Sequence, residues 1–87
     1  MVITKKTVAD HILKYVNRKI SLDDLVAWAE EALQEADFEK RDVELLRDIV
    51  GRLGLADVRE FGLSWDDCYE HLHKLGYDIS VSVSKTG

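Results

Sequence analysis

The densest group of reactive side chains in this sequence is Asp66-Asp67-Cys68-Tyr69-Glu70-His71-Leu72-His73. If this segment is helical, Asp67 and His71 are four residues apart, and Cys68 and His71 are three apart. Such spacings bring side chains together on one edge of a helix. A carboxylate, a thiol and an imidazole that converge in this way have two possible chemistries. They could ligate a metal ion, or they could form a Cys–His nucleophilic pair.

The surrounding sequence supports neither chemistry. Structural zinc needs four ligands, whereas this segment supplies two or three and no second cluster follows elsewhere. Cys68 also falls within the apolar stripe of its helix, where a thiol is usually inert packing. The chain lacks a glycine-rich phosphate loop, a Gly-x-Ser-x-Gly elbow and a His-Glu-x-x-His motif. We therefore predict no catalytic residue, no metal and no cofactor, and we interpret Asp67, Cys68 and His71 as packing and boundary residues.

A second candidate lies on the helix expected to begin after Ser21. At 100° per residue, three acidic side chains of this helix fall within about 40° of one another, and Trp28 lies beside them at the edge of the apolar stripe. An aromatic residue rimmed by carboxylates is typical of a binding hot spot for a basic protein. Alternatively, Trp28 covers the end of the core while its N–H reaches solvent or a carboxylate. The predicted partner-binding residues are Asp24, Trp28, Glu31 and Glu35.

The charge distribution favours a basic partner over a nucleic acid. The formal net charge is −5, with +4 in residues 1–22 and −7 in residues 23–48. Affinity for nucleic acids comes largely from neutralising phosphates, so this balance argues against nucleic-acid binding. The acidic middle would instead attract a basic protein. The alternative is a solvated acidic face that only keeps the protein soluble.

Length and composition indicate one soluble domain. Eighty-seven residues make a single domain, 1–87. No apolar run approaches the length of a membrane span, and no signal-peptide pattern follows Met1. The single Cys68 suits a reducing compartment. We expect a cytoplasmic protein that does not bind membranes.

Capping residues and glycines mark the expected helix boundaries, since the chain contains no proline. Capping side chains predict four helix starts, and Gly-apolar pairs predict left-handed helix stops. The expected caps are Thr4, Ser21, Asp42 and Ser64, and the expected stops are Gly54-Leu55, Gly62-Leu63 and Gly76-Tyr77. The first helix should end near Asn17, a polar break should span 37–41, and a one-turn helix should span 57–61.

Apolar periodicity gives each helix a buried stripe. The second helix has the tightest one, formed by Leu22, Leu25, Val26, Ala29, Ala32, Leu33 and Ala36. The final helix should present Trp65, Cys68, Tyr69, Leu72 and Leu75 inward.

The C-terminal segment predicts a strand, because apolar and hydroxyl side chains alternate over residues 79–84. Met1–Ile3 is the expected partner of this strand within the chain. A two-stranded ribbon leaves an open edge that a second copy could cover. We therefore predict a homodimer joined through Ile79, Val81 and Val83.

The predicted fold is mainly α: a compact bundle of four helices plus a one-turn helix, with a short β element formed by the N- and C-terminal segments. The favoured function is a non-catalytic protein–protein interaction domain, an acidic inhibitor of a basic partner in the manner of antitoxin or immunity proteins. The alternative is a homodimeric structural or regulatory protein. A thiol or metal-dependent enzyme is the least favoured hypothesis.

Overall fold

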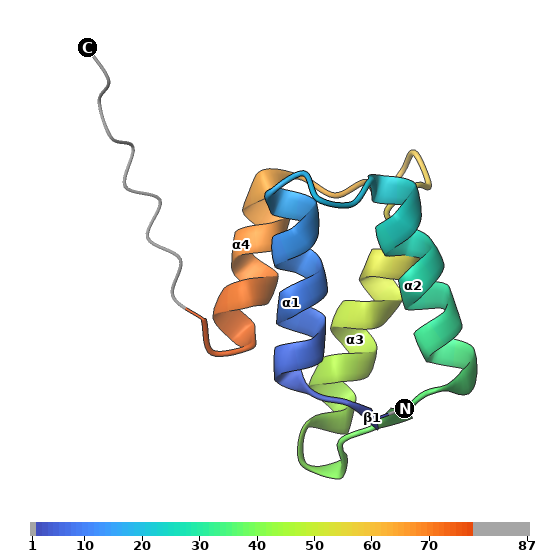
Figure 1. The fold of residues 1–87 in the computed structure, drawn as a ribbon, viewed down its shortest axis with the longest axis vertical. Helices are drawn as coiled ribbons and strands as arrows, with labels where there is room; N and C mark the ends of the chain where they lie inside the picture. Colours follow the sequence, from blue (N-terminus) through green and yellow to red (C-terminus); the bar gives the residue numbers. More distant parts are fainter. Residues whose placement is uncertain (1, 78–87) are drawn as a thin grey trace.

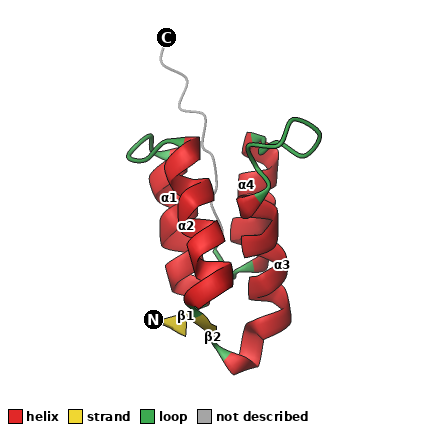
Figure 2. Ribbon diagram, turned by 90° about the vertical axis from the view of Figure 1, so that its right-hand side faces the viewer, coloured by secondary structure: helices red, strands yellow, loops and turns green. Residues whose placement is uncertain are grey.

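A computed structural model describes residues 2–77, in which four helices run alternately up and down in a bundle (Figure 1). The helices are α1 (Lys5–Val16), α2 (Leu22–Glu35), α3 (Val43–Gly54) and α4 (Trp65–Lys74). Figure 2 shows α1 and α2 on one side of the bundle and α3 and α4 on the other. The mainly helical class predicted from the sequence is confirmed. Within the described residues, no helix has the length and apolar character needed to cross a membrane.

Hydroxyl side chains cap the N-termini of three of these helices, as predicted. The Ser21 hydroxyl accepts a hydrogen bond from the Asp24 N–H at 3.1 Å, and the Ser64 hydroxyl accepts one from the Asp67 N–H at 3.1 Å. Each aspartate carboxylate in turn accepts from the N–H of its serine. Thr4 begins α1 with a similar reciprocal pair. These capping boxes form because the first N–H groups of a helix have no partner inside it.

The apolar stripes meet in one core. Its fully buried side chains include Ile3, Val8, Ile12, Leu25, Ala29, Leu46, Ile49, Leu53, Cys68 and Leu72. The most extensive helix contact joins α2 to α3, while α1 contacts each of the other three helices. The core therefore draws on every helix of the bundle.

Two residues of the predicted stripes are exposed at the margins of the core. Leu33 is 44% exposed and Trp65 is 48% exposed. Leu33 borders the seam between α2 and α3 at Gly54. Trp65 is the first residue of α4, and its ring stacks on that of Tyr15 with centroids 5.7 Å apart. Both side chains border the core rather than fill it.

A short parallel sheet ties the chain's start to the segment after α2. Strand β1 (Val2–Ile3) pairs with β2 (Asp37–Phe38), and the Glu39 N–H donates to the Ile3 carbonyl at 2.9 Å. The predicted polar break at 37–41 is therefore wrong at its first residues. A two-residue strand is too short for alternation to reveal, and it becomes a strand only through pairing with β1. The predicted strand at 79–84, which includes Ile79, Val81 and Val83, lies outside the described residues.

The segments before and after α3 also differ from the prediction. A 3₁₀ turn (Lys40–Asp42) leads into α3, and Asp42 makes no capping hydrogen bond. Its carboxylate instead lies 3.6 Å from the Lys5 ammonium. The one-turn helix predicted at 57–61 is a series of turns, in which the Phe61 N–H donates to the Val58 carbonyl at 2.9 Å. An isolated helical turn fixes several dihedrals for few hydrogen bonds and is poorly stable.

The left-handed conformation predicted at three glycines occurs at two of them, and the helix end predicted at Gly54 is confirmed. Gly62 and Gly76 have φ values of 60° and 93°, in the left-handed region that favours glycine. Gly54 is instead the last residue of α3. A Cβ on Gly54 would lie 3.6 Å from Leu33 Cδ1, an ordinary contact distance. Gly54 therefore ends α3 without a left-handed turn, and its contact with α2 leaves room for a side-chain methyl group.

Replacing Gly51 should stabilise the fold, whereas replacing Gly62 should destabilise it. Gly51 lies in mid-helix, and an added Cβ would meet no atom within 4 Å. Gly51→Ala should raise the free energy of unfolding by about 0.5–1 kcal/mol. A Cβ at position 62 would also meet no atom within 4 Å, but the alanine would have to adopt a positive φ. Gly62→Ala should therefore lower the free energy of unfolding by about 1–2 kcal/mol. Urea denaturation of both variants measures the two changes in the free energy of unfolding. Changes of the same sign in the two variants would contradict this account.

Candidate functional site

The four predicted partner-binding residues all lie on α2. Asp24, Glu31 and Glu35 are exposed, and Trp28 is half-buried. The opposite side of the helix packs into the core through Leu25 and Ala29. Burial of that side leaves the acidic side chains in solvent.

The exposed side of α2 carries more negative charge than the four predicted residues supply. Its carboxylates belong to Asp23, Asp24, Glu30, Glu31 and Glu35, all of them exposed, and the helix contains no Lys or Arg. We call these five residues the acidic face of α2. Across residues 2–77, the recorded ion pairs join Lys5 to Asp42, Lys6 to Asp10, Arg52 to Asp48 and Lys74 to Glu70. None of these pairs neutralises a carboxylate of the acidic face.

Trp28 joins the acidic face to α1. Its ring stacks on the His11 imidazole, with centroids 3.8 Å apart and planes 12° apart. His11 Nδ1 lies 2.8 Å from the Thr7 carbonyl. A carbonyl can only accept, so Nδ1 donates this bond and holds the imidazole in place. Trp28 therefore packs by one face while part of its ring remains in solvent. Only the pairing of α1 with α2 brings His11 and Trp28 together.

Asp24 has a structural role that the charge pattern alone does not indicate. Its carboxylate accepts from the Ser21 N–H at 3.2 Å and completes the capping box of α2. A change at Asp24 would therefore alter the start of the helix as well as the charge of its face. Glu30, Glu31 and Glu35 have no such task among the described residues.

Cys68 lies in the core and does not have the character of a nucleophile. The residue is fully buried, and burial, with the negative charge of Asp67 adding to it, raises the pKa of the thiol to about 11. At neutral pH the thiol stays protonated, and the protonated form is the unreactive one. Across residues 2–77, no three His, Cys, Asp or Glu side chains gather as metal ligands.

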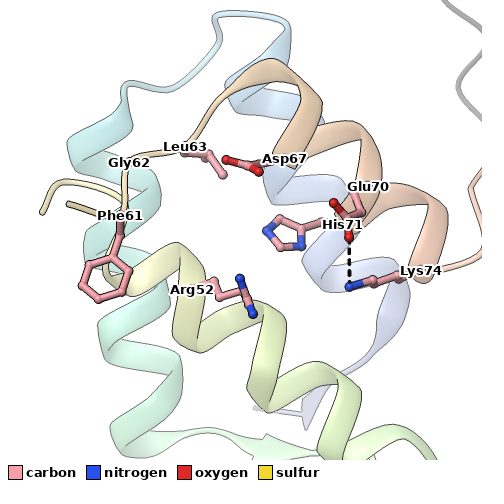
Figure 3. Close-up of a pocket in the computed structure, with 8 residues that line it drawn as sticks. All are labelled: Arg52, Phe61, Gly62, Leu63, Asp67, Glu70, His71 and Lys74. Atoms are coloured by element: carbon pink, nitrogen blue, oxygen red, sulfur yellow. Dashed lines mark ion pairs between the residues drawn. The ribbon is translucent and has the colours of Figure 1, made fainter. Parts of the chain in front are cut away.

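A recess of about 180 Å³ lies between α3 and α4, beside the segment at 61–63 (Figure 3). Its lining consists of Arg52 from α3, residues 61–63, and Asp67, Glu70, His71 and Lys74 from α4. Figure 3 shows the His71 imidazole pointing into the space among Arg52, Asp67 and Phe61. His71 is only 6% exposed, and its buried Nδ1 has no hydrogen-bond partner in the described structure. An unpaired buried polar atom costs about 1–3 kcal/mol.

Burial controls the protonation of His71. Burial lowers the pKa of the imidazole below its ordinary value of 6.5, and the positive charges of Lys74 and Arg52 lower it further. The carboxylates of Asp67 and Glu70 oppose this shift. Hydrogen bonds from Ser64, foremost from its backbone N–H, lower the pKa of Asp67 in turn. The recess thus holds a neutral imidazole among two cations and two carboxylates at neutral pH.

Comparisons of this chain with protein-family models, with curated proteins and with solved structures found no match. Its functional interpretation therefore follows from its own geometry. That geometry offers two features with chemical character: the acidic face of α2, and the recess over His71.

Acidification should destabilise the protein through His71. The folded state has the lower pKa, so the unfolded chain binds the proton first as the pH falls. The contribution of neutral His71 to the stability of the folded state is fully present above about pH 6.5. It is lost as the pH drops from there through the pKa of the folded state, with a slope of up to about 1.4 kcal/mol per pH unit for one proton.

Urea denaturation from pH 8 to pH 5 measures this effect as the difference between wild-type protein and His71→Gln. The variant keeps His11 and His73, so the difference isolates one imidazole. The stability advantage of the wild type should shrink as the pH falls. A difference that does not change with pH would contradict the burial account.

Proposed function

We propose that this chain is a non-catalytic protein-interaction domain that binds a basic protein through the acidic face of α2. The observation that carries the proposal is that five exposed carboxylates share one helix without a basic residue and without an ion pair in residues 2–77. Elsewhere in the same region, Lys5, Lys6, Arg52 and Lys74 each pair with an acidic side chain. A basic partner would therefore meet negative charge that the protein has not already neutralised.

Trp28 gives this surface an apolar anchor. Its ring is half-buried, and its stack on His11 limits its freedom before any partner arrives. An aromatic side chain that is already held in place loses little conformational entropy on binding. Aromatic residues surrounded by polar rims are frequent hot spots of interfaces. Binding and inhibition of a basic enzyme, in the manner of an antitoxin or immunity protein, would suit this composition.

The test removes charge from the acidic face without disturbing the helix cap. Glu30→Gln, Glu31→Gln and Glu35→Gln together delete three charges and leave Asp24 in place. The matched control, Glu44→Gln with Asp57→Asn and Glu60→Gln, deletes three exposed charges outside α2. Circular dichroism would verify that both variants remain helical.

Tagged wild-type protein would capture its partner from source-cell extract, and the purified partner would then be measured by surface plasmon resonance. The α2 variant should associate about tenfold more slowly and with a weaker dependence on salt, because charges at an interface act mainly on association. The control variant should bind like the wild type. Equal losses in both variants, or no loss in the α2 variant, would remove the proposal.

The second candidate is a homodimer joined through the strand expected at 79–83. The observation that favours it is that the described sheet consists of only two strands of two residues each. Such a sheet is marginal by itself and gains from a further strand. Sedimentation velocity at micromolar concentration should then show a dimer. Val81→Pro, which removes a backbone donor, should dissociate it, whereas Val81→Thr should not. A monomeric wild-type protein excludes this candidate.

A further inference from the structure

One side of the bundle presents two helices of opposite charge. α1 and α2 together form that side (Figure 2). α2 contributes the acidic face, whereas α1 contributes two exposed lysines near its two ends, Lys6 and Lys14. Two further exposed cations, Arg18 and Lys19, follow in the turn after α1. Positive and negative charges therefore lie side by side on this surface.

The stack of His11 on Trp28 lies at the seam between the two charges. Lys14 is three residues from His11 and is therefore its neighbour on α1. Asp24 and Glu31 are four and three residues from Trp28, so they are its neighbours on α2. The two rings are in contact, with centroids 3.8 Å apart. The half-buried indole is thus placed between the positive half and the negative half of the surface.

Most of these charges have no opposite charge recorded within residues 2–77. The ion pairs in that region leave Lys14, Arg18 and Lys19 without a carboxylate, and none of the pairs involves the acidic face. Lys6 pairs with Asp10 at 3.1 Å, but both side chains are well exposed. An exposed pair of this kind contributes little to stability, so Lys6 can exchange Asp10 for another carboxylate.

A surface with these two halves is complementary to itself in one orientation. When two copies meet face to face about a two-fold axis that runs parallel to the helices, α1 of each copy lies over α2 of the other. If the axis runs across the helices, α1 meets α1 and α2 meets α2, so like charges repel. The charges therefore select the first arrangement. The formal net charge of −5 on each copy opposes less specific contacts.

The directions of the two helices determine which ends of the faces meet. α1 and α2 run in opposite directions, so the start of α1 lies beside the end of α2 (Figure 1). A two-fold axis parallel to the helices keeps each residue at its height along the bundle. Lys6 of one copy then faces Glu31 in the later part of the other copy's α2, and Lys14 faces Asp23 in the earlier part. Trp28 lies at mid-height, near the axis, where aromatic residues are frequent hot spots.

We propose that the basic partner of the acidic face is a second copy of this chain, bound through α1 and α2 about a two-fold axis parallel to the helices. This inference rests on the proposed function, because it uses the same surface and names one occupant for it. Two helices that are each about 20 Å long and about 10 Å wide offer roughly 400 Å² per copy, less than a standard interface. The dimer should therefore be weak and reversible, and a basic protein of another kind would compete with the second copy.

Reversal of charge on each helix tests this arrangement. The α1 variant is Lys6→Glu with Lys14→Glu, and the α2 variant is Asp23→Lys with Glu31→Lys. Circular dichroism would verify that both variants are helical. Sedimentation equilibrium from about 10 µM to about 1 mM protein, at about 0.15 M salt to screen distant charges, measures the dissociation constants.

Each variant alone should self-associate at least about tenfold more weakly than the wild type, because like charges then meet at both contacts of a homodimer. An equimolar mixture of the two variants should regain the dimer. In the mixed dimer, the reversed α1 meets the reversed α2, and the two unchanged helices meet each other. Restoration on mixing also shows that both variants are folded.

The matched control is Lys40→Glu with Arg41→Glu, which reverses two charges on exposed residues outside both helices. The control should dimerise like the wild type, and so should Val81→Pro, which addresses the strand expected at 79–83. A monomeric wild type, an unchanged α1 variant, an equal loss in the control or in Val81→Pro, or a mixture that stays monomeric overturns the inference. Surface plasmon resonance with a partner from cell extract judges the proposed function separately, so the two failures are distinguishable.

Discussion

The close packing of α2 against α3 is the constraint on which the rest of the structure depends. Small residues of α2 allow it, because Ala29 and Ala32 are fully buried. Once α2 is held in this way, its rotation about its own axis is determined. Every carboxylate on its opposite side must then face solvent. The acidic surface is a direct consequence of where the alanines are buried.

The acidic residues of α2 have different tasks. Asp24 serves the helix itself, because its carboxylate completes the capping box with Ser21. Glu31 and Glu35 have no partner among residues 2–77 and serve no visible structural purpose. Trp28 lies between these cases, since it stacks on His11 yet remains partly in solvent. A binding role for this surface must therefore be sought in the later carboxylates and the indole, and not in Asp24.

The opposite side of the bundle is less tightly joined. α4 makes its larger contact with α1, so the side of α4 that faces α3 is left partly uncovered near residues 61–63. Gly62, with its positive φ, turns the chain there and allows Ser64 to cap α4. The result is a recess in which His71 is buried among charged neighbours, with one nitrogen unpaired. Polar groups in this setting are strongly influenced by the low local dielectric, which is why the imidazole stays neutral.

The sequence by itself determined the helices and their starting residues. Ser21 and Ser64 bond to residues three positions away, and apolar periodicity acts within a single helix, so both signals are local. It also identified α2 as the acidic helix, because charge can be counted without a fold. Tertiary structure alone decided the rest. β2 becomes a strand only by pairing with β1. Similarly, the stack of Trp28 on His11 and the burial of His71 require separate helices to meet.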